Sequence, residues 1–160
     1  YNSVCDNWGE PMVLDLKGFI NGGARTLAVD ATLDYTGEEY YGCHPFKQPV
    51  RVVGSVTNKA EVTRLLLRFP VQVFLPCDRC GRDTEKTVEV TVDRVLVTAL
   101  EGEDDGDYLL LPNEKLDLYA VCLEEIILSL PSKFLCKSDC KGACPVCGHN
   151  LNDGDCNCKR

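Results

Sequence analysis

The sequence predicts an α+β fold in which an antiparallel β-sheet, arranged as a meander or a partly open barrel, packs against one main helix and carries a cysteine-rich tail. Apolar and polar residues alternate in several runs between Leu27 and Val92, as in half-buried strands. The stretch from Tyr119 to Leu130 instead repeats its apolar residues with a helical period. The last 25 residues hold six of the eleven cysteines, which predicts a zinc-binding tail over residues 136–160.

Length and composition indicate a single folded domain over residues 12–160, because a 160-residue chain with 44% hydrophobic residues can bury a substantial core. The chain opens with Tyr1 and its only methionine is Met12, so we set residues 1–11 aside as upstream or vector-encoded additions. No apolar run approaches the roughly 18 residues of a membrane-spanning helix, and no signal peptide is evident. We therefore expect a cytoplasmic monomer that does not contact membranes.

The first predicted strands lie between residues 27 and 56. Residues 27–35 alternate, with Leu27 and its apolar partners on one face. Residues 36–49 are rich in glycine and proline and read as an irregular crossing, in which we interpret Cys43 and His44 as structural residues rather than metal ligands. Residues 50–56 alternate again, and residues 57–59 are expected to form a turn.

The longest extended run covers residues 65–75 and is followed by a second run over residues 88–92. Pro70 lies within the first run and cannot donate to a sheet ladder, so it indicates an edge position, a bulge or a break into two shorter strands. The two runs are joined by a turn that contains Cys77 and Cys80. The first cysteine pair is therefore predicted to lie at the tip of a β-hairpin.

One helix is predicted from about Tyr119 to Leu130, with Asp117 as its N-terminal cap and Pro131 marking its end. Its apolar stripe includes Cys122, which we expect to be buried as a small apolar residue. Its other face carries two acidic residues that we expect to face the solvent and not to act as an acid–base pair. These residues are Glu124 and Glu125.

Eight cysteines form four close pairs, which is the pattern expected of metal-bound thiolates. They are Cys77, Cys80, Cys136, Cys140, Cys144, Cys147, Cys156 and Cys158. Two pairs have the C-x-x-C-Gly form, in which the glycine, Gly81 or Gly148, permits the positive φ of a zinc knuckle. An odd total of eleven cysteines, their clustering and the absence of a secretion signal favour metal over disulfides.

Loop lengths favour one grouping of these cysteines into two four-thiolate sites. The link over 148–155 is short and rich in turn residues, so Cys144, Cys147, Cys156 and Cys158 are expected to form a compact terminal site. The four remaining cysteines would then join the tail to the hairpin tip. A single local site made by the cysteines at 136, 140, 144 and 147 is the alternative. We expect two structural zinc ions, although four thiolates also suit iron–sulfur clusters.

The sequence does not favour an enzyme. Four thiolate ligands leave no open coordination position on zinc, and no common catalytic or nucleotide-binding motif is present. A thioredoxin-type role for Cys77 and Cys80 would need the motif to open a helix, whereas predicted strands flank it.

An ordered series of motifs resembles a known family. It comprises Cys-Asp-Arg-Cys at 77–80, Leu-Asp-Leu at 116–118 followed by Glu-Glu-Ile-Ile-Leu-Ser-Leu-Pro, and Leu-Cys-Lys-Ser-Asp-Cys-Lys-Gly-Ala-Cys-Pro-Val-Cys-Gly-His-Asn-Leu-Asn at 135–152. Over residues 12–160 the chain resembles the large ribosomal RNA subunit accumulation proteins, the YceD-like proteins of bacteria and plastids. Gly81 stands where that family usually has leucine. The resemblance implies a non-enzymatic factor for 23S rRNA processing or accumulation in large-subunit biogenesis.

The partners implied by this resemblance are precursor 23S rRNA, large-subunit ribosomal proteins or both, with no small-molecule substrate. The formal net charge of −8 and the acidic loop over residues 101–107 are unfavourable for binding nucleic acid through many phosphate contacts. Basic residues cluster near the cysteines, where they either form an RNA-binding patch or only offset the charge of the thiolates. They are Arg79, Arg82, Lys86, Lys133, Lys137, Lys141, Lys159 and Arg160. A redox-sensing or protein-interaction adaptor without RNA contact is the alternative function.

Overall fold

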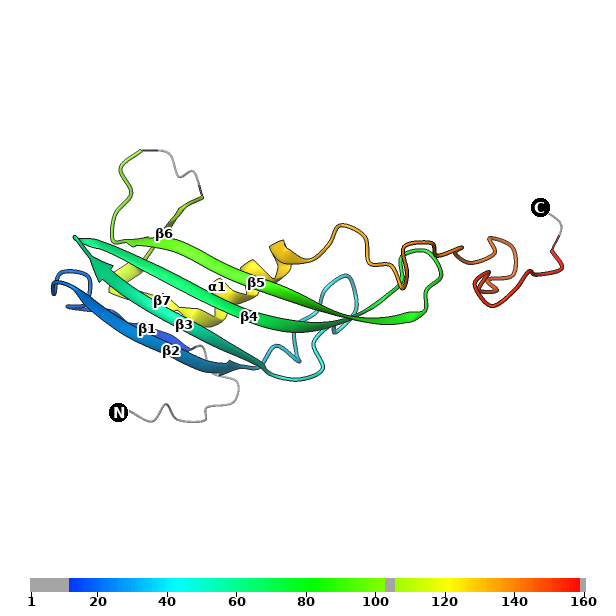
Figure 1. The fold of residues 1–160 in the computed structure, drawn as a ribbon, viewed down its shortest axis with the longest axis horizontal. Coiled ribbons are helices and arrows are strands. Elements are labelled where there is room, and N and C mark those ends of the chain that lie inside the picture. Colours follow the sequence, from blue (N-terminus) through cyan, green and yellow to red (C-terminus); the bar gives the residue numbers. More distant parts are fainter. Residues whose placement is uncertain (1–11, 103–105, 159–160) are drawn as a thin grey trace.

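The computed structural model describes residues 12–102 and 106–158, so the predictions for residues 1–11 and for the centre of the acidic loop lie outside it. Within these residues it contains two sheets and one long helix (Figure 1). The elements are β1 Val13–Asp15, β2 Arg25–Leu33, β3 Val50–Lys59, β4 Val62–Pro76, β5 Asp83–Val97, β6 Tyr108–Leu110, the 3₁₀ turn η1 Pro112–Glu114, β7 Lys115–Asp117 and α1 Leu118–Ser129. The chain after α1 runs along the β4–β5 hairpin and projects beyond its tip.

The main sheet has the strand order β2-β3-β4-β5-β6 and curls into a half-barrel around α1. Strands β2 to β5 form an antiparallel meander, as predicted. β6 pairs parallel to β5, and β1 pairs with β7 in a separate two-stranded sheet. These last pairings were not expected, but the α+β class with one main helix is confirmed.

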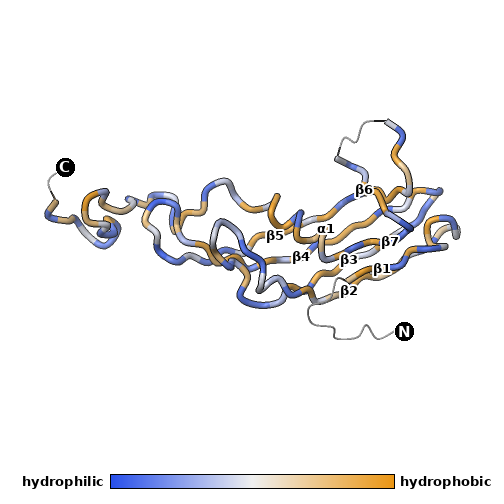
Figure 2. The backbone as a smooth tube through the Cα atoms, turned by 180° about the vertical axis from the view of Figure 1, so that it is seen from behind, coloured by the Kyte–Doolittle hydropathy of each residue, from blue (hydrophilic) through white to orange (hydrophobic). Residues whose placement is uncertain are grey.

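The hydrophobic core lies between the inner face of the sheet and α1. Alternate residues of β4 point inward, and Leu65, Leu67 and Phe69 are at most 1% exposed. From α1, Cys122 and Ile126 are fully buried, as the helical stripe predicts. Figure 2 shows the apolar stretches concentrated along the strands and the helix. Each fully buried large aliphatic side chain contributes about 1.5–3 kcal/mol, and this core involves none of the eight paired cysteines.

Pro70 occupies an open edge of an unbroken strand, which decides among the three predicted possibilities. β3 pairs with β4 only as far as Leu67, so beyond this point one edge of β4 faces no strand of the described part of the chain. The backbone N–H of Phe74 donates to the loop carbonyl of Pro45 at 2.8 Å, away from β5. Backbone N–H directions repeat every two residues in a strand, so the nitrogen of Pro70 also points away from β5. No ladder hydrogen bond is lost.

The predicted turn at residues 57–59 is wrong, because β3 continues to Lys59 and the turn falls on Ala60 and Glu61, both with positive φ. Asn58 explains the difference. It is 1% exposed, and its side-chain amide donates to the carbonyls of Phe19 and Ile20 at 3.0 and 2.6 Å. These long-range hydrogen bonds outweigh the local turn preference of asparagine.

Helix α1 begins as predicted, with the Asp117 carboxylate accepting from the backbone N–H of Ala120 at 3.1 Å. Glu124 is exposed, but the prediction that Glu125 also faces the solvent is wrong. Glu125 is largely buried and forms an ion pair with Arg94 of β5. This contact ties the helix to the strand whose other end carries the cysteine hairpin.

Candidate metal centre

The tip of the β4–β5 hairpin presents Cys77 and Cys80 in a tight turn, as predicted. The backbone N–H of Gly81 donates to the carbonyl of Cys77 at 2.8 Å, and the N–H of Cys77 donates to the carbonyl of Arg82 at 2.8 Å. Gly81 has φ +73°, the positive value expected of a zinc knuckle. The turn therefore places two thiols close together at the end of the sheet.

Phe134 brings the segment after α1 onto this tip. Its backbone N–H donates to the Asp78 carboxylate at 2.6 Å, and the N–H of Asp78 donates to the Phe134 carbonyl at 2.8 Å. The Phe134 ring is 4% exposed, and the Lys86 ammonium lies 5.0 Å from its centre. This reciprocal contact holds the next two cysteines beside the first pair.

The hairpin cluster consists of Cys77, Cys80, Cys136 and Cys140, whose sulfur atoms all lie within 4.8 Å of one another. Two cross-pair sulfur–sulfur distances are 3.8 Å (Cys77 to Cys140) and 3.7 Å (Cys80 to Cys136). A tetrahedral ion with metal–sulfur bonds of about 2.3 Å places its sulfurs roughly 3.8 Å apart. The donor set and its spacing therefore fit a four-thiolate metal ion.

The terminal cluster consists of Cys144, Cys147, Cys156 and Cys158, which also lie within 4.8 Å of one another through their sulfurs. Its knuckle repeats that of the hairpin, because the Gly148 N–H donates to the Cys144 carbonyl at 2.9 Å and Gly148 has φ +73°. The backbone N–H of Val146 also donates to the Cys144 sulfur at 3.4 Å. This site too has the donors of a four-thiolate ion.

Hydrogen bonds from the backbone favour one thiolate in each cluster. Burial opposes the ionisation of Cys77, but backbone N–H groups, that of Cys80 foremost, outweigh it and lower the pKa of Cys77 to about 6. Backbone N–H groups of Cys147 and Val146 likewise lower the pKa of Cys144 to about 6.

Other thiols of the same clusters shift in the opposite direction. Burial, together with hydrogen bonds to neighbouring thiols, raises the pKa of Cys136 to about 12. A hydrogen bond with Cys147, together with burial, raises the pKa of Cys158 to about 12. Close thiolates repel one another, and a central cation removes that repulsion so that all four sulfurs can ionise.

The structure brings all eight predicted cysteines together in the expected two groups of four, and the alternative local group of residues 136, 140, 144 and 147 is wrong. That these groups bind metal stays a prediction. Cys43 and His44 join neither cluster within the described residues, and the His44 ring nitrogen Nδ1 instead contacts the Glu38 carbonyl at 3.0 Å.

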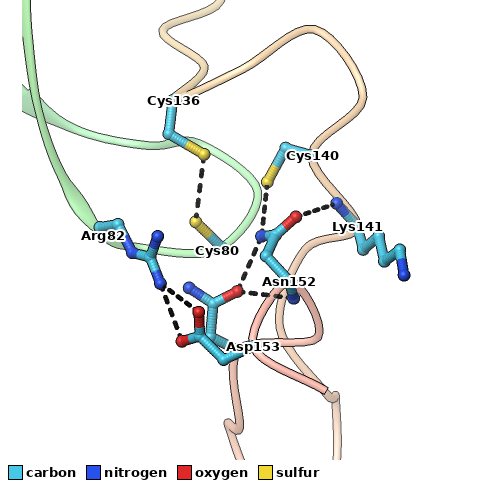
Figure 3. Close-up of polar contacts among 8 residues, drawn as sticks. Cys80, Arg82, Cys136, Cys140, Lys141, Asn152 and Asp153 are labelled. Carbon is cyan, nitrogen blue, oxygen red and sulfur yellow. Dashed lines mark hydrogen bonds and ion pairs between the residues drawn. The ribbon is translucent and has the colours of Figure 1, made fainter. Parts of the chain in front are cut away.

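Asn152 and Asp153 are polar residues of the site that the sequence prediction missed. They belong to the loop of the terminal cluster, yet Asn152 donates to the Cys140 sulfur and Asp153 pairs with Arg82 (Figure 3). The only local signal was the Asn-Leu-Asn-Asp turn sequence at 150–153. Asn152 contacts the hairpin cluster and Asp153 contacts the hairpin tip, so the terminal cluster is not the self-contained unit that loop length alone indicates.

The basic residues near the cysteines divide into those with a direct side-chain contact and those that form no salt bridge. Arg82 pairs with Asp153 at 2.6 Å, Arg79 donates to the Cys140 carbonyl at 3.0 Å, and Lys86 covers the Phe134 ring. Three lysines are exposed and form no salt bridge within the described residues. They are Lys133, Lys137 and Lys141, while Lys159 and Arg160 lie outside the described residues.

Over the described residues, the fold and the site define a class of protein: a curled, mostly antiparallel sheet with one main helix and two four-cysteine clusters that could hold metal ions. The family model "Large ribosomal RNA subunit accumulation protein YceD" matches residues 67–160, which include both clusters. This match covers more than half of the chain, and the chain belongs to the YceD family.

A curated relative supports the same assignment. The "Large ribosomal RNA subunit accumulation protein YCED homolog 1, chloroplastic" of Arabidopsis thaliana is 29% identical over 147 residues, covering 73% of this chain and 46% of the relative. The chain thus spans about half the length of that relative. No solved structure matches the chain. Among the described residues, no helix is long and apolar enough to cross a membrane.

Proposed function

We propose that this protein is a non-enzymatic factor that supports the processing or accumulation of 23S rRNA during assembly of the large ribosomal subunit. The observation that carries the proposal is the YceD family match over residues 67–160, because it includes the cysteine-bearing hairpin and the entire tail. The chemistry agrees with this role, since closed four-thiolate sites organise structure and offer no open coordination position.

Zinc is the ion that we propose for both clusters. Each cluster offers only sulfur donors in a near-tetrahedral arrangement, which structural zinc sites prefer. Elemental analysis of the purified protein should find two zinc ions per chain. A brown protein with iron and charge-transfer absorption would instead identify iron–sulfur clusters and contradict the zinc assignment.

Charge favours a basic ribosomal protein over naked RNA as the direct partner. Residues 77–86 at the hairpin tip and residues 131–160 together carry eight basic and six acidic side chains. Two four-thiolate zinc sites would each add a net charge of about −2, which makes this end slightly negative. The chain as a whole has a formal net charge of −8. We therefore propose that the factor binds a basic large-subunit protein and reaches the rRNA through it.

Co-purification of the tagged protein from growing cells tests the function. We expect large-subunit precursors and basic large-subunit proteins to be enriched, and their absence would contradict the role in assembly. Binding to purified rRNA at low salt separates the two partners, because direct phosphate contacts give a steep loss of affinity as salt rises. Tight, salt-sensitive binding to rRNA alone would overturn the preference for a protein partner.

The proposed role also suggests in which cell compartment the protein acts. The protein should be found where large ribosomal subunits are assembled, and we propose the cytoplasm as the first compartment to test. The name of the Arabidopsis relative assigns that protein to the chloroplast. Fractionation of cells that make the protein at its natural level, with ribosomal proteins as markers, distinguishes the cytoplasm from the chloroplast.

A further inference from the structure

A side chain from the loop of the terminal cluster reaches a sulfur of the hairpin cluster. Asn152 lies between Cys147 and Cys156 in the sequence, but its Nδ2 donates to the Sγ of Cys140 at 3.3 Å (Figure 3). Cys140 is 4% exposed, so few water molecules can replace this donor. A hydrogen bond to a buried cysteine sulfur is therefore supplied by the loop of the neighbouring cluster.

Every polar atom of the Asn152 side chain is committed, which fixes its orientation. Its Oδ1 accepts from the backbone N–H of Lys141 at 2.9 Å. Its Nδ2 also donates to the Oδ1 of Asn150 at 2.7 Å. The Oδ1 of Asn150 accepts a second hydrogen bond, from the backbone N–H of Asn152, at 3.0 Å. The backbone N–H of Lys141 needs an acceptor, so the Oδ1 of Asn152 must face Lys141. The NH₂ group of Asn152 must then face Cys140.

Further contacts hold the same loop against the hairpin tip. Asp153 accepts two hydrogen bonds from Arg82, at 2.6 and 2.8 Å. The backbone N–H of Ala143 donates to the Arg79 carbonyl at 3.1 Å, and that of Leu151 donates to the Gly142 carbonyl at 2.9 Å. The position of the loop thus depends both on the hairpin tip and on closure of the terminal cluster.

We propose that Asn152 is a positioning residue through which metal in the terminal cluster strengthens metal binding in the hairpin cluster. Metal held by Cys147 and Cys156 closes the loop that carries Asn152 and so presents its NH₂ group to Cys140. Hydrogen-bond partners of metal ligands typically change metal affinity by about 10- to 100-fold. The proposal rests on the metal binding proposed above.

The coupling acts in both directions. Linkage is reciprocal, so metal in the hairpin cluster must strengthen the terminal site by the same factor.

Cadmium and cobalt titrations of the full chain, with chelator competition, test the coupling. Affinity of the hairpin cluster is measured in four proteins: the parent, Asn152→Ala, Cys147→Ser and the double variant. We expect each single change to weaken the hairpin cluster by about tenfold or more. In the double variant the second substitution should cause no further loss of metal affinity in the hairpin cluster, because the terminal cluster acts through Asn152. Additive losses would overturn the proposal.

Three variants distinguish donation to the sulfur from simple packing of the loop. Asn152→Asp keeps the oxygen that serves Lys141 but has no NH₂ group and places a carboxylate beside Cys140. We expect it to weaken the hairpin cluster more than Asn152→Ala does. Asn21→Ala changes an exposed asparagine outside both clusters and should leave both sites unchanged. Full metal affinity in Asn152→Asp would show that only the oxygen matters and would refute the proposal.

Cadmium-113 NMR supplies a direct signature and an internal control. In the parent, the hairpin-cluster cadmium should couple through the Cys140 sulfur to an amide proton of Asn152, and the absence of this coupling would contradict the assignment. The terminal-cluster resonance of the same molecule reports whether a variant is folded. Failure of the parent to bind metal would refute both the metal proposal and this inference. Two sites that fill independently would refute the inference alone.

Discussion

Metal in the hairpin cluster should stabilise the whole sheet, and Cys80→Ser should remove that stabilisation. The cluster joins the hairpin tip to a segment 56 residues later in the sequence, so the site exists only when sheet and helix are folded. A ligand that binds only the folded state stabilises it by about 2.7 kcal/mol at 100 times its dissociation constant. For a domain of this size, about 2–4 °C per kcal/mol converts this to a fall in Tm of about 5–11 °C.

Cys147→Ser, in the terminal cluster, is the matched comparison. The four cysteines of that cluster lie within residues 144–158, so the unfolded chain can also gather them around metal, which reduces any direct stabilisation of the fold. Loss of metal from the terminal cluster should still weaken metal binding in the hairpin cluster through Asn152. A tenfold weaker hairpin site corresponds to about 1.4 kcal/mol under the same conditions. The expected fall in Tm is thus roughly half that of Cys80→Ser.

Thermal unfolding followed by far-ultraviolet circular dichroism, in buffers of fixed free zinc, measures both variants. Chelation should lower the Tm of the parent to that of a chelated Cys80→Ser protein, because both then lack metal. An unchanged parent after chelation, or a Cys147→Ser protein that loses as much as Cys80→Ser, would refute the reasoning.

Three further predictions concern the helix. Asp117→Ala should lower the free energy of unfolding by about 1 kcal/mol in urea titrations, because a backbone N–H loses its cap; an unchanged midpoint would contradict the capping role. Glu125→Gln should lower the free energy of unfolding by about 1–3 kcal/mol because Arg94 loses its charged partner. Glu124→Gln, on the exposed face, should change the free energy of unfolding by less than about 0.5 kcal/mol. Equal losses in the two variants would contradict the ion pair. Burial raises the pKa of Cys122 to about 12, so peptide mapping after alkylation near pH 8 should find it unmodified until the protein is denatured, and rapid native modification would argue against its burial.

Local patterns were sufficient to predict the elements whose stability is decided by neighbours in the sequence. The alternation around Phe69 places one face of β4 in the core whatever the strand pairing is. The glycine after each C-x-x-C pair predicts the positive φ of the knuckles because only glycine adopts it without strain. The spacing of the cysteines also predicted their grouping, since short loops limit which thiols can meet.

The missed features depend on a partner elsewhere in the sequence or lie in strands too short to show a period. Asn58 lies in a strand rather than a turn because it donates to carbonyls about 38 residues away. Glu125 is withdrawn from solvent by Arg94, 31 residues earlier. Asn152 contacts a sulfur of the other cluster, which no helical or strand period encodes. Strands β1, β6 and β7 have three residues each, too few to show a period.

The separation of the core from the clusters allows the partner-binding surface to be located by a single treatment. The core between the sheet and α1 is built without the paired cysteines, so chelation should leave it folded, although less stable. The tail beyond Phe134 contacts the hairpin tip through a few hydrogen bonds and the Arg82–Asp153 ion pair, so we expect removal of bound metal by chelation to release it. A partner that is lost on chelation therefore binds the cluster-bearing end, whereas a partner that remains bound uses the sheet or the exposed face of α1.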